Sequence, residues 1–226
     1  GCAAIWRAFP PAPAIRRWCA RSGGRAGVSP DPSRSAGGTP PSGHGLFVAV
    51  VGPSGAGKDT LLALAAEELA KTPGIVFARR IVTRDAIAAI EDHDVMSPAD
   101  FAEAEASGAF CLSWRAHGLA YGLPAYLKTA LTDGTIVVAN VSRRVLAQAA
   151  ERFARLAIVE ITAPPAVLVA RIAARGRETP EEISARIARQ VELTVPPGAE
   201  AHHRIVNDGS PQDGRRRLVE ILRAAS

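Results

Sequence analysis

Apolar residues fall into short continuous runs that alternate with stretches of helical periodicity. The run 46–51 (LFVAVV) is rich in β-branched residues and contains no polar residue, which is typical of a strand covered on both faces. The stretch 58–71 repeats apolar residues at helical spacing and stops before Pro73-Gly74. Further strands are predicted at 75–82, 110–114, 135–140, 157–162 and 203–206. Further helices are predicted at 97–108, 124–131, 143–153, 165–175, 177–190 and 211–224.

This order of strands and helices predicts an α/β fold, with a parallel sheet flanked by helices on both faces. Ligands of such folds lie beyond the carboxyl ends of the strands. The first such end is Val51, so we expect the functional site to begin there.

Residues 1–45 differ in composition from the remainder, 46–226, which fits one domain. They contain 7 prolines and 8 glycines, and six arginines against a single acidic residue, Asp31. So many prolines oppose an amphipathic helix, which favours a disordered extension over an Arg-rich transit peptide. A misassigned start is a further interpretation, because the chain begins at Gly1 and its only methionine is Met96.

The net charge of +5 belongs to this extension, because the remaining residues hold 21 basic and 21 acidic side chains. The basic pI is therefore no argument for a nucleic-acid partner. Three scattered cysteines show neither a disulfide framework nor metal-ligand spacing, so we expect a cytoplasmic protein. No apolar run reaches about 18 residues, so we expect no membrane partner. The oligomeric state is not indicated.

The segment 52–58 has the spacing G-x-x-x-x-G-K between the first strand and the first helix. Its glycines let successive backbone N–H groups turn inward toward a phosphate, and the helix N-terminus adds partial positive charge. Lys58 is expected to reach the β- and γ-phosphates of ATP. The predicted phosphate-binding loop consists of Gly52, Pro53, Ser54, Gly55, Ala56, Gly57 and Lys58.

Asp59 follows the lysine, where this motif normally has a serine or threonine that holds Mg²⁺, and Thr60 comes next. A carboxylate is an acceptable hard ligand for Mg²⁺, so Asp59 is the candidate metal ligand.

Arginines gather at two further places. Arg79, Arg80 and Arg84 lie at the end of the predicted strand 75–82, and Thr83 with Arg84 could hold an acceptor phosphate opposite the loop. A second group could form a flap that closes over ATP and excludes water. It consists of Arg171, Arg175, Arg177, Arg186 and Arg189.

We find no convincing carboxylate base, which suits a phosphate acceptor, since that is already an anionic nucleophile. His93 and His117 could each bind substrate, although a lone histidine is as often an ordinary surface or core residue.

Several ordered segments resemble the guanylate-kinase-like phosphotransferases over residues 46–224. Within that group the chain is most similar to the ribose 1,5-bisphosphate phosphokinases of phosphonate catabolism, which implies ATP-dependent synthesis of 5-phosphoribosyl 1-diphosphate. It also implies a small acceptor-binding subdomain and an Arg-rich lid. The segments are 52–60 (GPSGAGKDT), 82–84 (VTR), 97–121, 140–143 (NVSR), 175–186 (RGRETPEEISAR) and 206–210 (VNDGS).

The departures from guanylate kinase concern base recognition. The guanine-binding glutamate would fall at Ser113, and a second guanine contact at Leu123. Two acidic positions near residue 140 become Asn140 and Ser142. A serine cannot accept from both guanine N–H donors as a carboxylate does. The pocket that the resemblance implies therefore suits a sugar phosphate better than GMP.

The resemblance also implies roles for individual residues. Gly52 to Asp59 would bind ATP and Mg²⁺, Asn207 would lie near the adenine, and phosphates in transfer would meet Arg171, Arg175 and Arg186. The acceptor would be bound by Arg84, His93, Ser113, His117, Tyr121 and Asn140.

Two other functions stay open. The chain could be a guanylate kinase or another nucleoside monophosphate kinase with a rearranged pocket. It could also be a non-catalytic guanylate-kinase-like binding module, although such modules usually lose the loop lysine and Lys58 is present.

Overall fold

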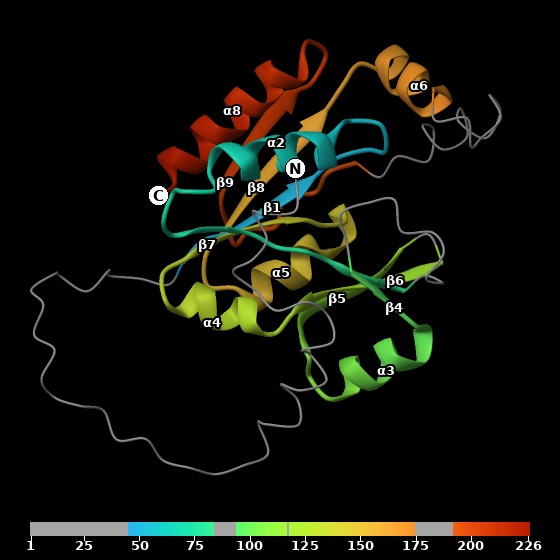
Figure 1. The fold of residues 1–226 in the computed structure, drawn as a ribbon, viewed down its shortest axis with the longest axis vertical. Helices are drawn as coiled ribbons and strands as arrows, with labels where there is room; N and C mark the ends of the chain where they lie inside the picture. Colours follow the sequence, from blue (N-terminus) through green and yellow to red (C-terminus); the bar gives the residue numbers. More distant parts are fainter. Residues whose placement is uncertain (1–44, 84–93, 117, 175–191) are drawn as a thin grey trace, which may run out of the picture. The chain divides into compact units, whose positions relative to one another are not determined.

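Two β-sheets organise the part of the chain that the computed structural model describes, which is residues 45–83, 94–116, 118–174 and 192–226. Figure 1 shows the larger sheet with helices on both faces, and the smaller sheet with a short helix next to it. The extension predicted at 1–45 lies outside the described residues apart from Gly45. The helix and lid arginines predicted within 177–190 lie outside them too.

The larger sheet has five strands, all parallel, as the alternation of strands and helices predicts. Its carboxyl edge is where the chain turns into the predicted phosphate-binding loop after residue 51. Across the sheet the order is β2 (Ile75–Phe77), β7 (Ile136–Asn140), β1 (Phe47–Val51), β8 (Leu156–Thr162) and β9 (Ala199–Val206).

Helices cover both faces of this sheet, which confirms the predicted fold class. Helices α2 (Lys58–Glu68) and α8 (Pro211–Ala224) pack on one face, and α4 (Tyr126–Thr132) and α5 (Leu146–Arg152) on the other. Helix α6 (Pro165–Ala173) follows β8. Among the described residues, no helix is long and apolar enough to cross a lipid bilayer.

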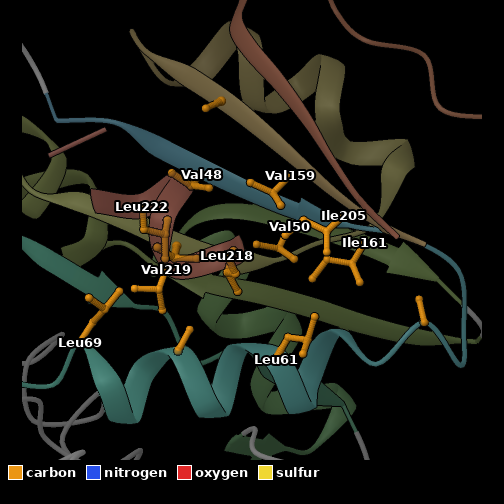
Figure 2. Packing of buried hydrophobic residues seen from close by; sticks show 14 of the residues in the cluster. Val48, Val50, Leu61, Leu69, Val159, Ile161, Ile205, Leu218, Val219 and Leu222 are labelled. Carbon is orange, nitrogen blue, oxygen red and sulfur yellow. The ribbon is translucent and has the colours of Figure 1, made fainter. Parts of the chain in front are cut away.

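The central strand β1 sends alternate side chains to opposite faces, and both faces are buried. Val48 and Val50 join the cluster beneath α2 and α8, together with Leu61 and Leu218 (Figure 2). Phe47 and the residues two and four positions after it join the cluster beneath α4 and α5. Two buried faces explain why the run 46–51 contains no polar residue.

The smaller sheet has the order β4 (Asp94–Met96), β3 (Ile81–Thr83), β6 (Leu119–Pro124) and β5 (Phe110–Ala116). Strands β5 and β6 form an antiparallel pair. Helix α3 (Pro98–Ala106) lies next to β5 and begins at Ser97, whose Oγ accepts from the Asp100 N–H at 3.1 Å. Leu112, Trp114 and Leu123 of this sheet join the apolar cluster of the larger sheet, so the two sheets share a core.

The prediction of one strand over 75–82 is wrong. Its first half is β2 of the larger sheet, its second half is β3 of the smaller sheet, and 78–80 link the two. The chain changes partners within three residues, because β2 pairs with β7 of the larger sheet whereas β3 pairs with β4 and β6 of the smaller one. Strands β4 and β6 are absent from the sequence prediction, and the helix predicted from 143 opens with a 3₁₀ turn at Arg143–Val145.

Candidate active site

The loop between β1 and α2 requires glycine at its two ends. Gly52 has φ 148°, and a Cβ there would lie 1.9 Å from the carbonyl oxygen of Ile161 in the neighbouring strand. Gly57 has φ 86°, and a Cβ there would lie 2.5 Å from Nδ2 of Asn207. Both positions combine a left-handed backbone with contact on the side where a side chain would project. The loop is therefore closed tightly over the carboxyl edge of the larger sheet.

Lys58 folds back over this loop. Its Nζ donates to the carbonyl oxygen of Gly52 at 2.8 Å and to that of Pro53 at 2.9 Å. The ammonium is thus fixed beside the N-terminus of α2, where partial positive charge from the helix also favours an anion. This geometry gives a bound phosphate a preorganised cation.

Asn207 and Arg171 support the loop from below. The buried side chain of Asn207 donates from Nδ2 to the carbonyl oxygen of Ala56 at 2.8 Å. Arg171 donates from NH1 to the backbone carbonyl of Asn207 at 2.9 Å. The guanidinium of Arg171 therefore lies close to the loop, and its contact with phosphate stays a prediction. For Asn207 the structure shows a loop-supporting role, and its contact with adenine stays a prediction.

Asp59 occupies the first turn of α2 and is held from the larger sheet. Nδ2 of Asn140, at the carboxyl end of β7, donates to its Oδ1 at 2.6 Å. NH2 of Arg80 lies 3.4 Å from the same oxygen. The Asp59 side chain remains 57% exposed, so the carboxylate is open to solvent. Asn140 is buried and lies beside the candidate metal ligand, and its predicted contact with the acceptor stays a prediction.

Arg80 and Tyr121 connect Asp59 with the smaller sheet. The Arg80 guanidinium lies over the Tyr121 ring, with 5.9 Å between Cζ and the ring centroid. Tyr121 stacks on Trp114 with ring centroids 5.4 Å apart and an interplanar angle of 7°. The aromatic pair is anchored in the shared core through Trp114. Tyr121 therefore faces the loop side, where the resemblance places the acceptor.

Ser113 faces the other side of the smaller sheet. Its hydroxyl hydrogen-bonds to Glu105 of α3, which also accepts from NH1 of Arg115 at 3.0 Å. Hydrogen bonds from Arg115 and then Ser113 lower the pKa of Glu105 to about 2. Ser113 and Tyr121 are thus not brought together, although both were predicted to bind the acceptor. Leu123 is completely buried in the shared core and lines no surface.

A buried carboxylate, Glu160 on β8, was not singled out from the sequence. Its Oε1 accepts from NH2 of Arg143 at 3.0 Å, and its Oε2 accepts from Nε of Arg204 at 2.8 Å. Glu160 pairs in the parallel register with Val51, which is the last residue before the loop begins. The only signal in the sequence is one acidic residue inside the apolar run 156–162.

Several predicted site residues lie outside the described part of the chain, and two others extend into solvent. Ser54 and Thr60 are exposed on the loop and on the first turn of α2. Within the described ranges no three His, Cys, Asp or Glu side chains come together as a metal cluster. The predicted residues outside the described ranges are Arg84, His93, His117, Arg175, Arg177, Arg186 and Arg189.

Comparison with known proteins identifies the family and the fold of this chain. Residues 47–196 match the family model described as AAA domain. The solved structures that are similar to this chain include a guanylate kinase from Anaplasma phagocytophilum, with a TM-score of 0.55. The match is 17% identical and covers 80% of this chain and 86% of that one. At that identity the likeness concerns the fold, and it confirms the guanylate-kinase-like architecture.

Curated relatives are far more similar in sequence. A ribose 1,5-bisphosphate phosphokinase of Methylobacterium radiotolerans is 51% identical over 180 residues, which cover 80% of this chain and 98% of the relative. The enzyme of the same name from Rhodopseudomonas palustris is 50% identical over 181 residues, covering 80% and 90%. The one from Chelativorans sp. is 47% identical over 186 residues, covering 81% and 87%. The chain, with its phosphate-binding loop and its second small sheet, belongs to the ribose 1,5-bisphosphate phosphokinase family.

Proposed function

We propose that this chain transfers the γ-phosphoryl group of ATP to the 1-phosphate of ribose 1,5-bisphosphate. The bond from the γ-phosphorus to the β–γ bridging oxygen breaks, and a bond to an oxygen of the acceptor phosphate forms. The products are ADP and 5-phosphoribosyl 1-diphosphate. The proposal includes a place in phosphonate catabolism and a cytoplasmic location.

One observation carries the donor half of the proposal, which is the position of Lys58. Its ammonium is fixed by two carbonyl groups of an intact glycine loop, at the N-terminus of a helix. A cation held there stabilises negative charge on the β- and γ-phosphates without reorganisation during transfer. A binding module without catalysis has no need of such an arrangement. Relatives with about 50% sequence identity to this chain are also named as phosphokinases.

Asp59 and Asn140 fit the magnesium ion that accompanies ATP. Mg²⁺ is usually bound through one or two carboxylates, with water and substrate phosphates filling the other positions. A single exposed carboxylate, oriented by the amide of Asn140, meets that requirement without a cage of protein ligands. When bound, the ion neutralises charge on the phosphates, and Asp59 is the residue that would hold it.

The two carboxylates near the loop, Glu160 and Asp59, are engaged by other side chains, which suits an acceptor that needs no general base. Glu160 is buried and held by two arginines, Arg143 and Arg204. Asp59 is engaged by Asn140 and Arg80. Neither group is placed as a base that would remove a proton from a hydroxyl. A phosphate oxygen needs no such base, so positioning and charge neutralisation are sufficient.

GMP is the less suitable acceptor. A guanine base needs a carboxylate or comparable acceptor for its N–H donors. The Ser113 side chain lies beside Glu105 on the far side of the smaller sheet, and Leu123 is buried. Neither of the two positions aligned with base recognition offers a group to a base.

The test is to identify the product. Enzyme, ATP, Mg²⁺ and ribose 1,5-bisphosphate are incubated, and phosphorus NMR is recorded. A new diphosphate attached to the sugar, formed in equal amount to ADP, is the expected result. ADP release without a sugar diphosphate would reject the proposed acceptor.

A further inference from the structure

Arg80 lies on the short link between the two sheets, and its side chain is only 17% exposed. Its backbone carbonyl accepts from the Asp94 N–H at 3.0 Å, which fixes the link to β4. From that point its guanidinium reaches both Asp59 on the loop side and Tyr121 on the smaller sheet. Arg80 therefore touches the candidate metal ligand and the acceptor side at once.

Both of these contacts are weak ones. The NH2 to Oδ1 distance of 3.4 Å is at the long end for a hydrogen bond, while Asn140 holds the same oxygen at 2.6 Å. The distance of 5.9 Å to the Tyr121 centroid is near the limit for a cation–π contact. A guanidinium has five N–H donors, and within the described residues Arg80 uses one of them in a side-chain hydrogen bond. A largely buried cation with donors to spare is suited to bidentate binding of a phosphate.

We propose that Arg80 binds a phosphate of the acceptor, and that Asp59 holds it only until the carboxylate is engaged by the magnesium of ATP. This inference rests on the proposed function. A guanidinium beside Asp59 lowers the affinity of that carboxylate for another cation. Once Asp59 is engaged, the guanidinium is repelled toward Tyr121, where it meets the acceptor phosphate. Loading of ATP and binding of acceptor are thereby coupled in a favourable direction.

The coupling predicts effects of opposite sign in Arg80→Gln. Loss of a charge-assisted, bidentate contact weakens acceptor binding by about 10- to 100-fold. Binding of the magnesium complex of ATP is unchanged or tighter, by up to about 5-fold, because Asp59 loses a competing cation. A purely structural role for Arg80 would weaken both, since misplacing the link disturbs both sides of the site.

Calorimetry with the full chain measures the two affinities separately. The first titration adds a non-hydrolysable ATP analogue with Mg²⁺ to the enzyme, and the second adds ribose 1,5-bisphosphate to the enzyme saturated with that analogue. Arg80→Lys keeps the charge but loses the fork, so its acceptor affinity should fall between wild type and Arg80→Gln. Arg79→Gln is the matched control, because it removes the neighbouring charge, which pairs with Asp94 instead. Melting temperatures show whether each variant is folded.

Weakened acceptor binding with retained analogue binding in Arg80→Gln, and neither change in Arg79→Gln, is the expected pattern. Acceptor affinity within 2-fold of wild type would overturn the role of Arg80, and so would equal weakening of both ligands. If Arg80→Gln does not fold, Arg80→Lys decides, and wild-type acceptor affinity in it would overturn the proposal. Failure of the wild-type enzyme to bind ribose 1,5-bisphosphate would reject the proposed function, and this inference with it. A wild type that binds the acceptor, together with an Arg80 variant that binds it equally well, would reject the inference alone.

Discussion

The side-chain amide of Asn140 donates a 2.6 Å hydrogen bond to the carboxylate of Asp59, joining the end of β7 to the first turn of α2. In phosphate-binding loops of this kind the residue after the lysine is usually a serine or threonine, and the Mg²⁺-binding carboxylate stands on a strand. Here the carboxylate is on the helix and the neutral partner is on the strand. The site keeps a single negative charge but moves it next to Lys58.

This exchange predicts a rescue. Asp59→Ser removes the carboxylate and should lower kcat/KM by about 100-fold and raise the Mg²⁺ concentration needed for half-maximal rate. The double variant Asp59→Ser with Asn140→Asp restores the usual arrangement and should recover about tenfold or more of that loss. Steady-state kinetics over a Mg²⁺ series gives both numbers. A double variant no more active than Asp59→Ser alone would show that the pair is not the metal site.

Lys58 should be needed for turnover and not for folding. Lys58→Ala removes the cation that the loop carbonyls hold, and should lower kcat by about 100- to 1,000-fold with an unchanged melting temperature. Lys71→Ala is the matched control, because that lysine is exposed just beyond the far end of α2. Full activity in Lys58→Ala would mean that the loop assignment is wrong.

Glu105 should make stability depend on acid pH. Its pKa is lowered from 4.5 to about 2, so the carboxylate binds protons less readily in the folded state than in the unfolded state. The resulting stabilisation is complete above pH 4.5 and is lost as the pH falls toward 2. Because the side chain is 32% exposed, we expect no more than about 1 kcal/mol.

Urea unfolding of wild type and Glu105→Gln at several pH values tests this. The wild type should be the more stable at pH 6, and the difference should shrink as the pH approaches 3. A difference that grows as the pH falls would have the opposite sign and would contradict the lowered pKa.

Cys111 should be slow to react with thiol reagents in the folded protein. Burial raises the pKa of its thiol to about 11, and its Sγ contacts the carbonyl oxygen of Leu123 at 3.5 Å. Two units above the ordinary value of 9.0 mean a roughly 100-fold smaller thiolate fraction. In a variant with Cys2 and Cys19 changed to serine, modification at pH 8 should be slow without urea and rapid with it. Equal rates in both conditions would show that the thiol is accessible.

The central strands, the phosphate-binding loop and the first and last helices could be predicted from sequence, because each has a local cause. Strand β1 is buried on both faces and is apolar throughout. The N-terminus of α8 is set by Ser210, whose Oγ accepts from the Asp213 N–H at 3.2 Å. Such patterns and caps are carried by residues close together in the chain.

The split of 75–82 between two sheets could not be predicted, because the partners of β3 are residues 94–96 and 121–122, far along the chain. The face on which Ser113 lies follows from pairing and a bulge in β5, and a strand alone does not reveal which face meets a ligand. The meeting of Asp59, Asn140 and Arg80 depends on three elements folding together. Motif spacing placed Asp59 at the site, whereas only the family resemblance connected Asn140 with the acceptor, and neither gave Arg80 a role of its own.

A parallel assay of acceptors tests the central claim most directly. ADP release is coupled to a spectrophotometric readout with ATP and Mg²⁺, and ribose 1,5-bisphosphate and GMP are offered separately over the same concentration range. We expect saturable turnover with the sugar bisphosphate and a kcat/KM for GMP lower by a factor of about 10⁴ or more, because Ser113 and Leu123 do not replace the guanine contacts of guanylate kinase. Turnover with GMP at a comparable kcat/KM would contradict the account and identify a nucleotide kinase.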